Sequence, residues 1–325
     1  MRTEHPPAAS VLPGARLPLI DTARGVALVA MVVYHLAWDL RYFGYIASDV
    51  ESGLGWRIFA HTIAGSFLFI VGVSLVLASR RGLNWRRYFR RLALIVASAA
   101  AITLATWFTF RETFIFFGIL HHIAVASVLG LAFLRAPAAV TIAAAVFCFA
   151  APAFLSAPLF DHAALVWIGL ATTLPRTNDF VPLFPWFGAV LAGVAAAQLW
   201  PSLGFDRMAD WNAVRVPRAL LFVGRHSLLI YLLHQPILFG LTDLVAQIYP
   251  PALLGFEPAY IESCEVSCAE SEGDTEICRR TCGCIADRAQ AEGLWSGMMR
   301  QSLSVEQELR YFTLVDECRA AAEAQ

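Results

Sequence analysis

The sequence contains no lysine, and all 24 basic residues of the 325-residue chain are arginine. Charged residues make up only 15% of the chain and the formal net charge is −1, so no polycationic surface suggests nucleic acid as a partner. Hydrophobic residues make up 58%, and the mean hydropathy of +0.61 lies outside the range of ordinary soluble domains. The composition therefore indicates a membrane protein.

Several motifs of soluble enzymes are also absent. The chain has no glycine-rich phosphate loop, no Gly-x-Ser-x-Gly nucleophile elbow and no His-Glu-x-x-His motif, and no metal site is expected. Prolines interrupt residues 1–19 and no small-residue cleavage site follows, so a cleaved signal peptide is not expected. Any chemistry is therefore expected from side chains within the membrane.

Apolar runs of about 20 residues, the length that crosses a bilayer core of about 30 Å, recur along the chain. They predict an all-α, polytopic membrane helix bundle with spans at 17–40, 56–79, 90–110, 114–134, 137–156, 182–200 and 226–249. An eighth candidate, "HAALVWIGLATTLP" from His162, is short and ends in proline. An eighth span would reverse the side on which the C-terminus emerges.

Arginine placement favours seven spans, because cytoplasmic loops of membrane proteins are enriched in basic residues. The loop from Arg80 to Arg91 holds six arginines and is expected in the cytoplasm, which places the N-terminal segment 1–16 there too. The membrane domain is then expected at 17–249, and residues 250–325 are expected in the periplasm of a bacterial inner membrane. Seven spans also keep the arginines from Arg207 to Arg225 inside.

The segment after residue 250 is rich in cysteine and is expected to be a small helical tail. Cys264 and Cys268 are four residues apart, as are Cys278 and Cys282, so the two members of each pair share a helix face. A helical hairpin would join Cys264 to Cys282 and Cys268 to Cys278. The alternative is a four-thiolate zinc site, but an oxidising compartment favours disulfides.

Two other features of the tail predict its architecture. Cys284 and Cys318 are candidates for a third bridge, whereas Cys148 lies in a predicted span and is expected to be an inert core residue. Ser304 followed by Gln307 is typical of a capping box that opens a last helix.

Ionisable side chains inside the predicted spans are the candidate functional residues, because each costs about 2.5–3.5 kcal/mol to insert. His35 and Asp39 are four residues apart on the first span, so the carboxylate is expected to orient the imidazole as a general base. Arg24 lies eleven residues before His35, about 16 Å along a helix, near the cytoplasmic surface. Further polar candidates at these two levels are Arg225, His121, His122, His234 and Gln235.

The two levels suggest a division of labour. Arginines grip phosphate groups bidentately, and imidazole titrates near neutral pH. An anionic ligand from the cytoplasm would be held at the arginine level and would react at the histidine level, an arrangement that fits acyl-CoA. The simpler alternative is that a neutral buried histidine bonds only to a neighbouring helix.

Five segments occur in order between residues 15 and 245: "DTARGVALVAMVVYH", "GSFLFIVGVSLVLASR", "FGILHHIAVAS", "PLFPWFGAVLAGV" and "GRHSLLIYLLHQPI". They resemble successive signatures of the heparan-alpha-glucosaminide N-acetyltransferase catalytic-domain family, in its bacterial branch. The resemblance implies a transmembrane acyltransferase that moves an acyl group, expected to be acetyl, from cytoplasmic acetyl-CoA. The acceptor implied is an amine or hydroxyl of an envelope or extracellular glycan.

The resemblance leaves two histidines open as the catalytic base. The arginine–glycine pair followed by His35 also resembles the first span of bacterial membrane O-acyltransferases, in which that histidine is regarded as catalytic. Animal lysosomal members of the N-acetyltransferase family carry asparagine at that position and a catalytic histidine beyond the first span, for which His61 is the nearest later histidine. His35 is preferred here because Asp39 is its neighbour.

The alternative function is a proton-coupled small-molecule transporter in which the intramembrane histidines form a proton relay. Carriers of that kind often contain two internal repeats, and the halves of this chain show no convincing self-similarity. The lipid bilayer is the expected partner in either case. The sequence leaves the oligomeric state open and is compatible with a homo-oligomer.

Overall fold

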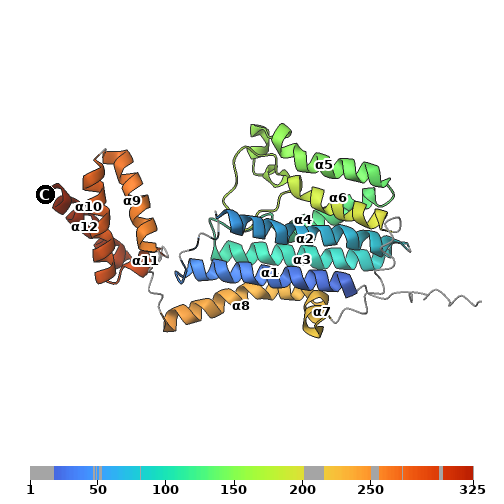
Figure 1. Ribbon diagram of the computed structural model, residues 1–325, viewed down its shortest axis with the longest axis horizontal. Helices are drawn as coiled ribbons and strands as arrows, with labels where there is room; N and C mark the ends of the chain where they lie inside the picture. Colours follow the sequence, from blue (N-terminus) through green and yellow to red (C-terminus); the bar gives the residue numbers. More distant parts are fainter. Residues whose placement is uncertain are drawn as a thin grey trace, which may run out of the picture. The chain divides into compact units, whose positions relative to one another are not determined.

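Long apolar helices build most of the computed structural model, which describes residues 18–46, 48, 50, 53–80, 82–200, 216–249, 256–272, 274–299 and 303–324. The helices before the first long irregular segment are α1 (Pro18–Tyr42), α2 (Leu54–Ser79), α3 (Trp85–Thr109), α4 (Ile119–Leu129), which continues as the 3-10 turn η1 (Gly130–Phe133), and α5 (Ala138–Leu155) (Figure 1). They are followed by α6 (Leu183–Leu199), α7 (Arg218–Arg225) and α8 (Ser227–Ile248). The C-terminal helices are α9 (Phe256–Glu272), α10 (Thr275–Ala291), α11 (Trp295–Met299) and α12 (Val305–Glu323).

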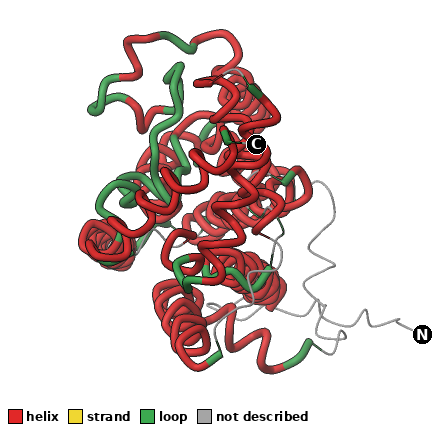
Figure 2. The backbone as a smooth tube through the Cα atoms, turned by 90° about the vertical axis from the view of Figure 1, so that its left-hand side faces the viewer, coloured by secondary structure: helices red, strands yellow, loops and turns green. Residues whose placement is uncertain are grey.

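The predicted all-α membrane bundle is confirmed. Within the described residues, α1, α2, α3, α5 and α8 are long and apolar enough to cross a membrane, and α4 with η1 and α6 are shorter apolar helices at the remaining predicted positions. Figure 2 shows no strand in the described backbone; its only β-type pairing is the isolated bridge between Phe117 and Phe180. The chain is therefore a multi-pass helical membrane protein.

The eighth candidate span does not form a membrane-length helix. The segment around His162 contains the 3-10 turns η2 (Pro158–Asp161) and η3 (Val166–Ile168), separated by irregular backbone. Asp161 holds this backbone by accepting hydrogen bonds from the amide of Thr172 at 2.6 Å and from that of Thr173 at 3.2 Å. The apolar run from His162 is therefore part of the connection between α5 and α6.

The chain packs as two compact units. The first takes in residues up to 31 and 59–233, and the second takes in 32–58 and 234–325. Helices α1, α2 and α8 therefore contribute to both units. The boundary expected near residue 250 was drawn from hydropathy and remains a prediction.

Glycine allows α2 and α6 to pack backbone to backbone in the first unit. A side chain at Gly72 would place its first carbon 2.0 Å from the carbonyl oxygen of Val190, and one at Gly193 would place it 2.0 Å from that of Phe69. Small residues are what membrane helices use for such close approach. Both contacts bury α6, whose Val190 and Leu191 are fully shielded from solvent.

Three disulfides cross-link the helices of the tail, and their pairing is the predicted one. Cys264 is bonded to Cys282 and Cys268 to Cys278, which joins α9 to α10. The third bridge, between Cys284 and Cys318, joins α10 to α12. Cys148 is free and buried within α5, as expected of a core residue.

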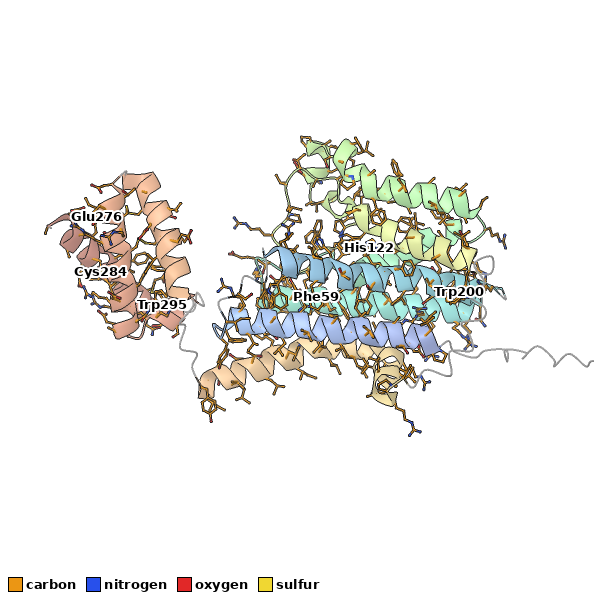
Figure 3. The ribbon with its side chains drawn as sticks, in the orientation of Figure 1. Phe59, His122, Trp200, Glu276, Cys284 and Trp295 are labelled. Carbon is orange, nitrogen blue, oxygen red and sulfur yellow. A yellow bond between two sulfur atoms is a disulfide. The ribbon has the colours of Figure 1, made fainter. Side chains whose placement is uncertain are left out.

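The tail has its own apolar core and polar surface. Ile285, Leu314 and Trp295 pack together with Cys318. Figure 3 labels Trp295 and Cys284, which also contacts this core. The predicted capping box is present, because Ser304 Oγ accepts from the Gln307 amide at 3.2 Å and Gln307 Oε1 accepts from the Ser304 amide at 3.0 Å. These features indicate a domain that is held together by covalent and apolar contacts within itself.

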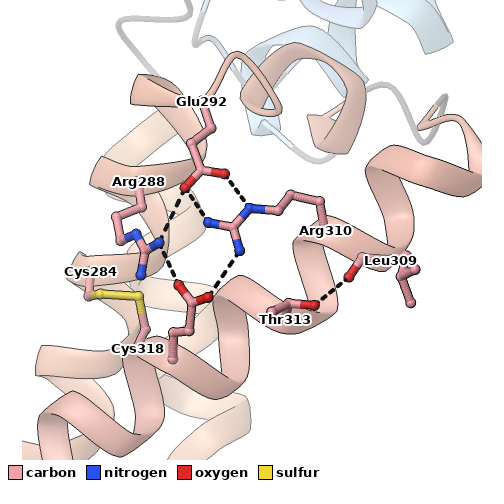
Figure 4. A network of polar contacts seen from close by, with 8 residues as sticks. Cys284, Arg288, Glu292, Leu309, Arg310, Thr313 and Cys318 are labelled. Carbon is pink, nitrogen blue, oxygen red and sulfur yellow. Dashed lines mark hydrogen bonds and ion pairs between the residues drawn. A yellow bond between two sulfur atoms is a disulfide. The ribbon is translucent and has the colours of Figure 1, made fainter.

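An exposed ion-pair network lies near the Cys284–Cys318 bridge. Arg310 donates to Glu292 at 2.6 Å and lies 3.1 Å from Glu317, and Arg288 lies 3.3 Å from Glu292 (Figure 4). The arginine partners hold the pKa of both glutamates below the ordinary range. Such exposed pairs stabilise a fold only modestly, so the disulfides remain the main constraint on the tail.

Candidate functional site

A pair of histidines from α1 and α8 lies at the centre of the first candidate site. The ring centroids of His35 and His234 are 4.9 Å apart, with an interplanar angle of 62°. The ring of Tyr34 also lies near that of His35, at a centroid distance of 5.6 Å. His35 is half-buried, and its ring nitrogens have no hydrogen-bond partner among the described residues, so they are available to a ligand.

A buried acid and an amide form the adjoining contact between the same two helices. Gln235 Nε2 donates to Asp39 Oδ1 at 2.7 Å, and Asp39 is 0% exposed. Since His35 and Asp39 are one helical turn apart, the consecutive residues His234 and Gln235 each face one of them. These four side chains are called the His-Asp cluster below.

The structure gives Asp39 a different partner from the one expected. The sequence predicted that its carboxylate would orient His35, but its hydrogen bond goes to Gln235 on α8. The ring of His35 instead contacts that of His234. Residues at i and i+4 share a helix face without necessarily touching, and here the facing helix supplies a better donor to the carboxylate.

A second cluster joins α1, α2 and α7. Arg24 donates from Nη2 to Ser74 Oγ at 2.6 Å, and its Nη1 lies 3.6 Å from Asp21 Oδ1. Arg225 Nε lies 3.5 Å from Asp21 Oδ2. These four residues are called the Asp21 cluster below; it holds two guanidinium groups against one carboxylate.

Close backbone packing fixes this second cluster. A side chain at Gly224 would place its first carbon 1.7 Å from the carbonyl oxygen of Asp21, and one at Gly25 would place it 2.4 Å from that of Leu220. α7 therefore lies directly on the first turns of α1. The side chains of Arg24 and Arg225 remain 24% and 47% exposed, so an anion can reach both.

His121 is engaged in hydrogen bonds within the first unit. Thr103 Oγ1 lies 3.1 Å from His121 Nε2 and donates its own hydrogen to the carbonyl oxygen of Ile115 at 2.7 Å. The Gly118 amide donates to His121 Nδ1 at 3.2 Å, which assigns the ring hydrogen to Nε2. Both ring nitrogens are thus used to fix the start of α4.

His122 is fully buried and braces the connection before α6 (Figure 3). Its Nδ1 lies 3.2 Å from the carbonyl oxygens of both Val181 and Pro182, so Nδ1 carries the hydrogen. His121 and His122 therefore bond to groups of the first unit, whereas His35 and His234 belong to the second.

Asp179 is a half-buried acid that the sequence did not single out. Its Oδ2 accepts a hydrogen bond from the Ile119 amide at 3.0 Å, at the N-terminus of α4. Loss of hydration raises its pKa to about 6. No local signal marks this role, because the partner amide lies sixty residues earlier in the chain.

His61, the alternative catalytic histidine, has a different setting. It is exposed on α2, and its ring contacts Trp186 at a centroid distance of 5.3 Å. No acid of the described chain forms a hydrogen bond or ion pair with it. The same holds for His35, but His35 is half-buried and its ring lies beside that of His234.

One family model matches the part of the chain that contains both clusters. The family model described as heparan-alpha-glucosaminide N-acetyltransferase, catalytic, matches residues 16–236. This range includes all members of the His-Asp cluster and of the Asp21 cluster, and it ends before the tail. No curated protein and no solved structure shows significant similarity to the chain. Since the match covers more than half of the sequence, the chain belongs to the heparan-alpha-glucosaminide N-acetyltransferase catalytic family of membrane acetyltransferases.

Proposed function

We propose that the protein transfers an acetyl group from acetyl-CoA to an amine or hydroxyl group of a glycan, with His35 as the general base. The observation that carries this proposal is the half-buried imidazole of His35, which has unbonded ring nitrogens beside His234 and a buried acid. Inserting an ionisable side chain into a membrane span costs free energy, and such residues usually mark a functional site. The family match supports acetyl transfer as that function.

The reaction needs one base and one leaving group. His35 takes a proton from the acceptor, whose nitrogen or oxygen attacks the thioester carbon of acetyl-CoA. The new carbon–nitrogen or carbon–oxygen bond forms as the carbon–sulfur bond breaks, and the electron pair leaves on the CoA sulfur. That sulfur takes up a proton to give free CoA, so no oxidant, reductant or metal is consumed.

The Asp21 cluster is the proposed binding site for the CoA phosphates. Its two arginines exceed its single carboxylate by one positive charge, and guanidinium groups bind phosphate oxygens bidentately. The competing interpretation is that Arg24 and Arg225 only stabilise the packing of α1 against α2 and α7. Both arginine side chains are partly exposed, which supports the ligand-binding role. Arginines that only hold helices together need no such exposure.

Substitution of these arginines separates the two interpretations. Arg225→Ala is expected to raise the KM for acetyl-CoA about tenfold, since a hydrogen bond to a charged group contributes about 1.5–3 kcal/mol. The kcat at saturation should change little, because a phosphate contact lies far from the reacting carbon. Arg24→Ala should act in the same direction, and both are measured by steady-state release of CoA.

Arg218, at the start of the same short helix α7, is the matched control. It is exposed, and Arg218→Ala removes the same charge without touching Asp21. Its KM should stay within about twofold of the unmodified protein. An unchanged KM in both the Arg24 and Arg225 variants would refute phosphate binding at the Asp21 cluster.

The proposed location is the inner membrane of a bacterium, with the N-terminus in the cytoplasm and the tail in the periplasm. The three disulfides support this orientation, because such bonds persist in oxidising compartments and are rare in the cytosol. The acceptor glycan would then be met on the periplasmic side, and acetyl-CoA on the cytoplasmic side.

The direct test of the function is acetyl transfer by the purified full-length protein. Supplied with radiolabelled acetyl-CoA and a mixed pool of sugars, the protein should release CoA and label one or more sugars. A carrier that uses the same histidines for proton movement would leave acetyl-CoA intact. Absence of CoA release with every acceptor would therefore overturn the enzyme proposal.

A further inference from the structure

Three arginines at the start of α3 carry charge that no described acid balances. The side chains of Arg86, Arg87 and Arg90 are exposed, and none of them forms an ion pair or a hydrogen bond with another residue of the described chain. Neither α3 nor α4, on which α3 packs, contains an acidic residue. The three charges are therefore available to an anion from outside the chain.

The packing of α3 turns two of these arginines away from the protein. Tyr88 donates from its hydroxyl to the Ser127 carbonyl oxygen at 3.1 Å, and Ile95, seven residues further along α3, is buried. Arg86 and Arg90 lie about half a turn around the helix from Tyr88. Because they are four residues apart, they share one face, with about 5–6 Å between their first side-chain carbons. One phosphate group can therefore contact both guanidinium groups.

An exposed aromatic pair lies beside the two arginines. Trp85 and Phe89 are 55% and 56% exposed, and their rings are stacked with centroids 5.7 Å apart. They are also four residues apart, so they form a stripe next to that of Arg86 and Arg90. Val96, seven residues after Phe89, is exposed and extends this stripe along the apolar part of α3. The four residues Trp85, Arg86, Phe89 and Arg90 are called the α3 patch below.

We infer that the α3 patch binds the headgroup of an anionic phospholipid, a role independent of acetyl transfer. Arg86 and Arg90 hold the phosphate by bidentate hydrogen bonds, because guanidinium groups match its oxygens in geometry and charge. Trp85 and Phe89 lie at the level between headgroups and hydrocarbon, where tryptophan is enriched in membrane proteins. The first part of an acyl chain packs along these rings and Val96.

The apolar stripe favours a lipid over a soluble phosphate ligand. A nucleotide or inorganic phosphate would need the arginines, but not an exposed apolar surface that continues along a helix of membrane-crossing length. The simpler alternative is that these arginines only direct the insertion of α3, since basic residues are retained on the cytoplasmic side. Insertion depends on charge alone, and requires neither the spacing of Arg86 and Arg90 nor the stacked aromatic pair beside them.

The experiment measures which lipid contacts Trp85 in nanodiscs that hold the full-length protein. The lipid is phosphatidylcholine with an increasing fraction of phosphatidylglycerol, and bromine atoms near the headgroup end of either lipid's acyl chains quench a tryptophan that they contact. The signal of Trp85 is obtained by subtracting the fluorescence of Trp85→Phe, which keeps an aromatic ring there. Phosphatidylglycerol should bind beside Trp85 at least about tenfold more tightly than phosphatidylcholine. Equal quenching by the two brominated lipids would overturn the inference.

Two variants locate this preference at the arginines. Arg90→Gln should reduce it about fivefold, since one arginine near an anionic headgroup contributes about that factor. Arg86→Gln combined with Arg90→Gln should leave phosphatidylglycerol preferred by less than about twofold. The matched control is Arg57→Gln combined with Arg111→Gln, which removes two exposed arginines near other helix ends. It should keep the preference within about twofold of the unmodified protein.

Other outcomes contradict the inference in distinct ways. If the preference survives the loss of Arg86 and Arg90, these arginines serve insertion only. If the control variant loses it equally, net charge rather than the α3 patch attracts the lipid. If acetyl-CoA or inorganic phosphate restores the fluorescence of Trp85, the arginines bind the phosphate of a soluble ligand. CoA release does not enter the test, so failure of the proposed function would leave the inference intact.

Discussion

His35→Ala is expected to lower acetyl transfer by about two to four orders of magnitude, which is the usual contribution of a positioned general base. The loss should appear in kcat, because the imidazole acts on the acceptor proton in the reaction step and does not contact the CoA phosphates. CoA release under single-turnover conditions measures this step directly. Membrane insertion and the melting profile should stay close to those of the unmodified protein, since His35 makes no hydrogen bond within the described chain.

His61→Ala provides the control for this experiment. His61 is exposed on α2 and contacts Trp186, so its removal should change the rate by no more than about twofold. Near-full activity in His35→Ala would remove His35 from the mechanism. A large loss in His61→Ala instead would transfer the role of base to His61.

The helices of the membrane part were predictable from hydropathy, but several of their ends were not. The third span was expected from residue 90, yet α3 begins at Trp85, because Asn84 caps it by accepting from the Arg87 amide at 3.0 Å. Hydropathy marks the part of a helix that lies in lipid and says nothing of a polar first turn.

The start of α4 depended on a contact that no local pattern reveals. The fourth span was expected from residue 114, but α4 begins at Ile119. The residues before it bond to the segment that precedes α6: Asn178 donates to the Thr113 carbonyl oxygen at 2.9 Å, and Val181 donates to that of Phe117 at 3.1 Å. Extended pairing across more than sixty residues overrides the apolar character of the segment.

The cysteine pairing of the tail could be predicted from the sequence, whereas the partner of Asp39 could not. Helix periodicity sets which cysteines of a hairpin meet, so the pairs of α9 and α10 could be read from their spacing. The same periodicity placed His35 and Asp39 on one face of α1. It could not identify Gln235 as the partner of Asp39, because 196 residues separate the two and only the packing of α8 brings them together.

Removing both bridges between α9 and α10 is expected to release α9 from the tail while leaving acetyl transfer intact. The double variant Cys264→Ser, Cys268→Ser breaks two loops with sequence separations of 18 and 10. Closing a loop of about 15 residues by a disulfide contributes about 3 kcal/mol in the chain-entropy model, a large share of the stability of so small a domain. Five glutamates and no basic residue lie in α9, so a glutamate-specific protease should cut it rapidly in the variant and slowly in the unmodified protein.

The rest of the tail and the membrane part supply the controls. The Cys284–Cys318 bridge still joins α10 to α12 in the double variant, so these helices should resist the protease longer than α9 does. Cys148→Ser, which removes the free buried cysteine of α5, should leave the cleavage pattern of the tail unchanged. CoA release should stay within about twofold in both variants, because the family match ends at residue 236 and places the catalytic part before the tail.

In the unmodified protein the tail cysteines should resist alkylation until a reductant is added. Ready alkylation without reductant would show that the tail lies in a reducing compartment, and would contradict both the bridges and the periplasmic orientation proposed from them.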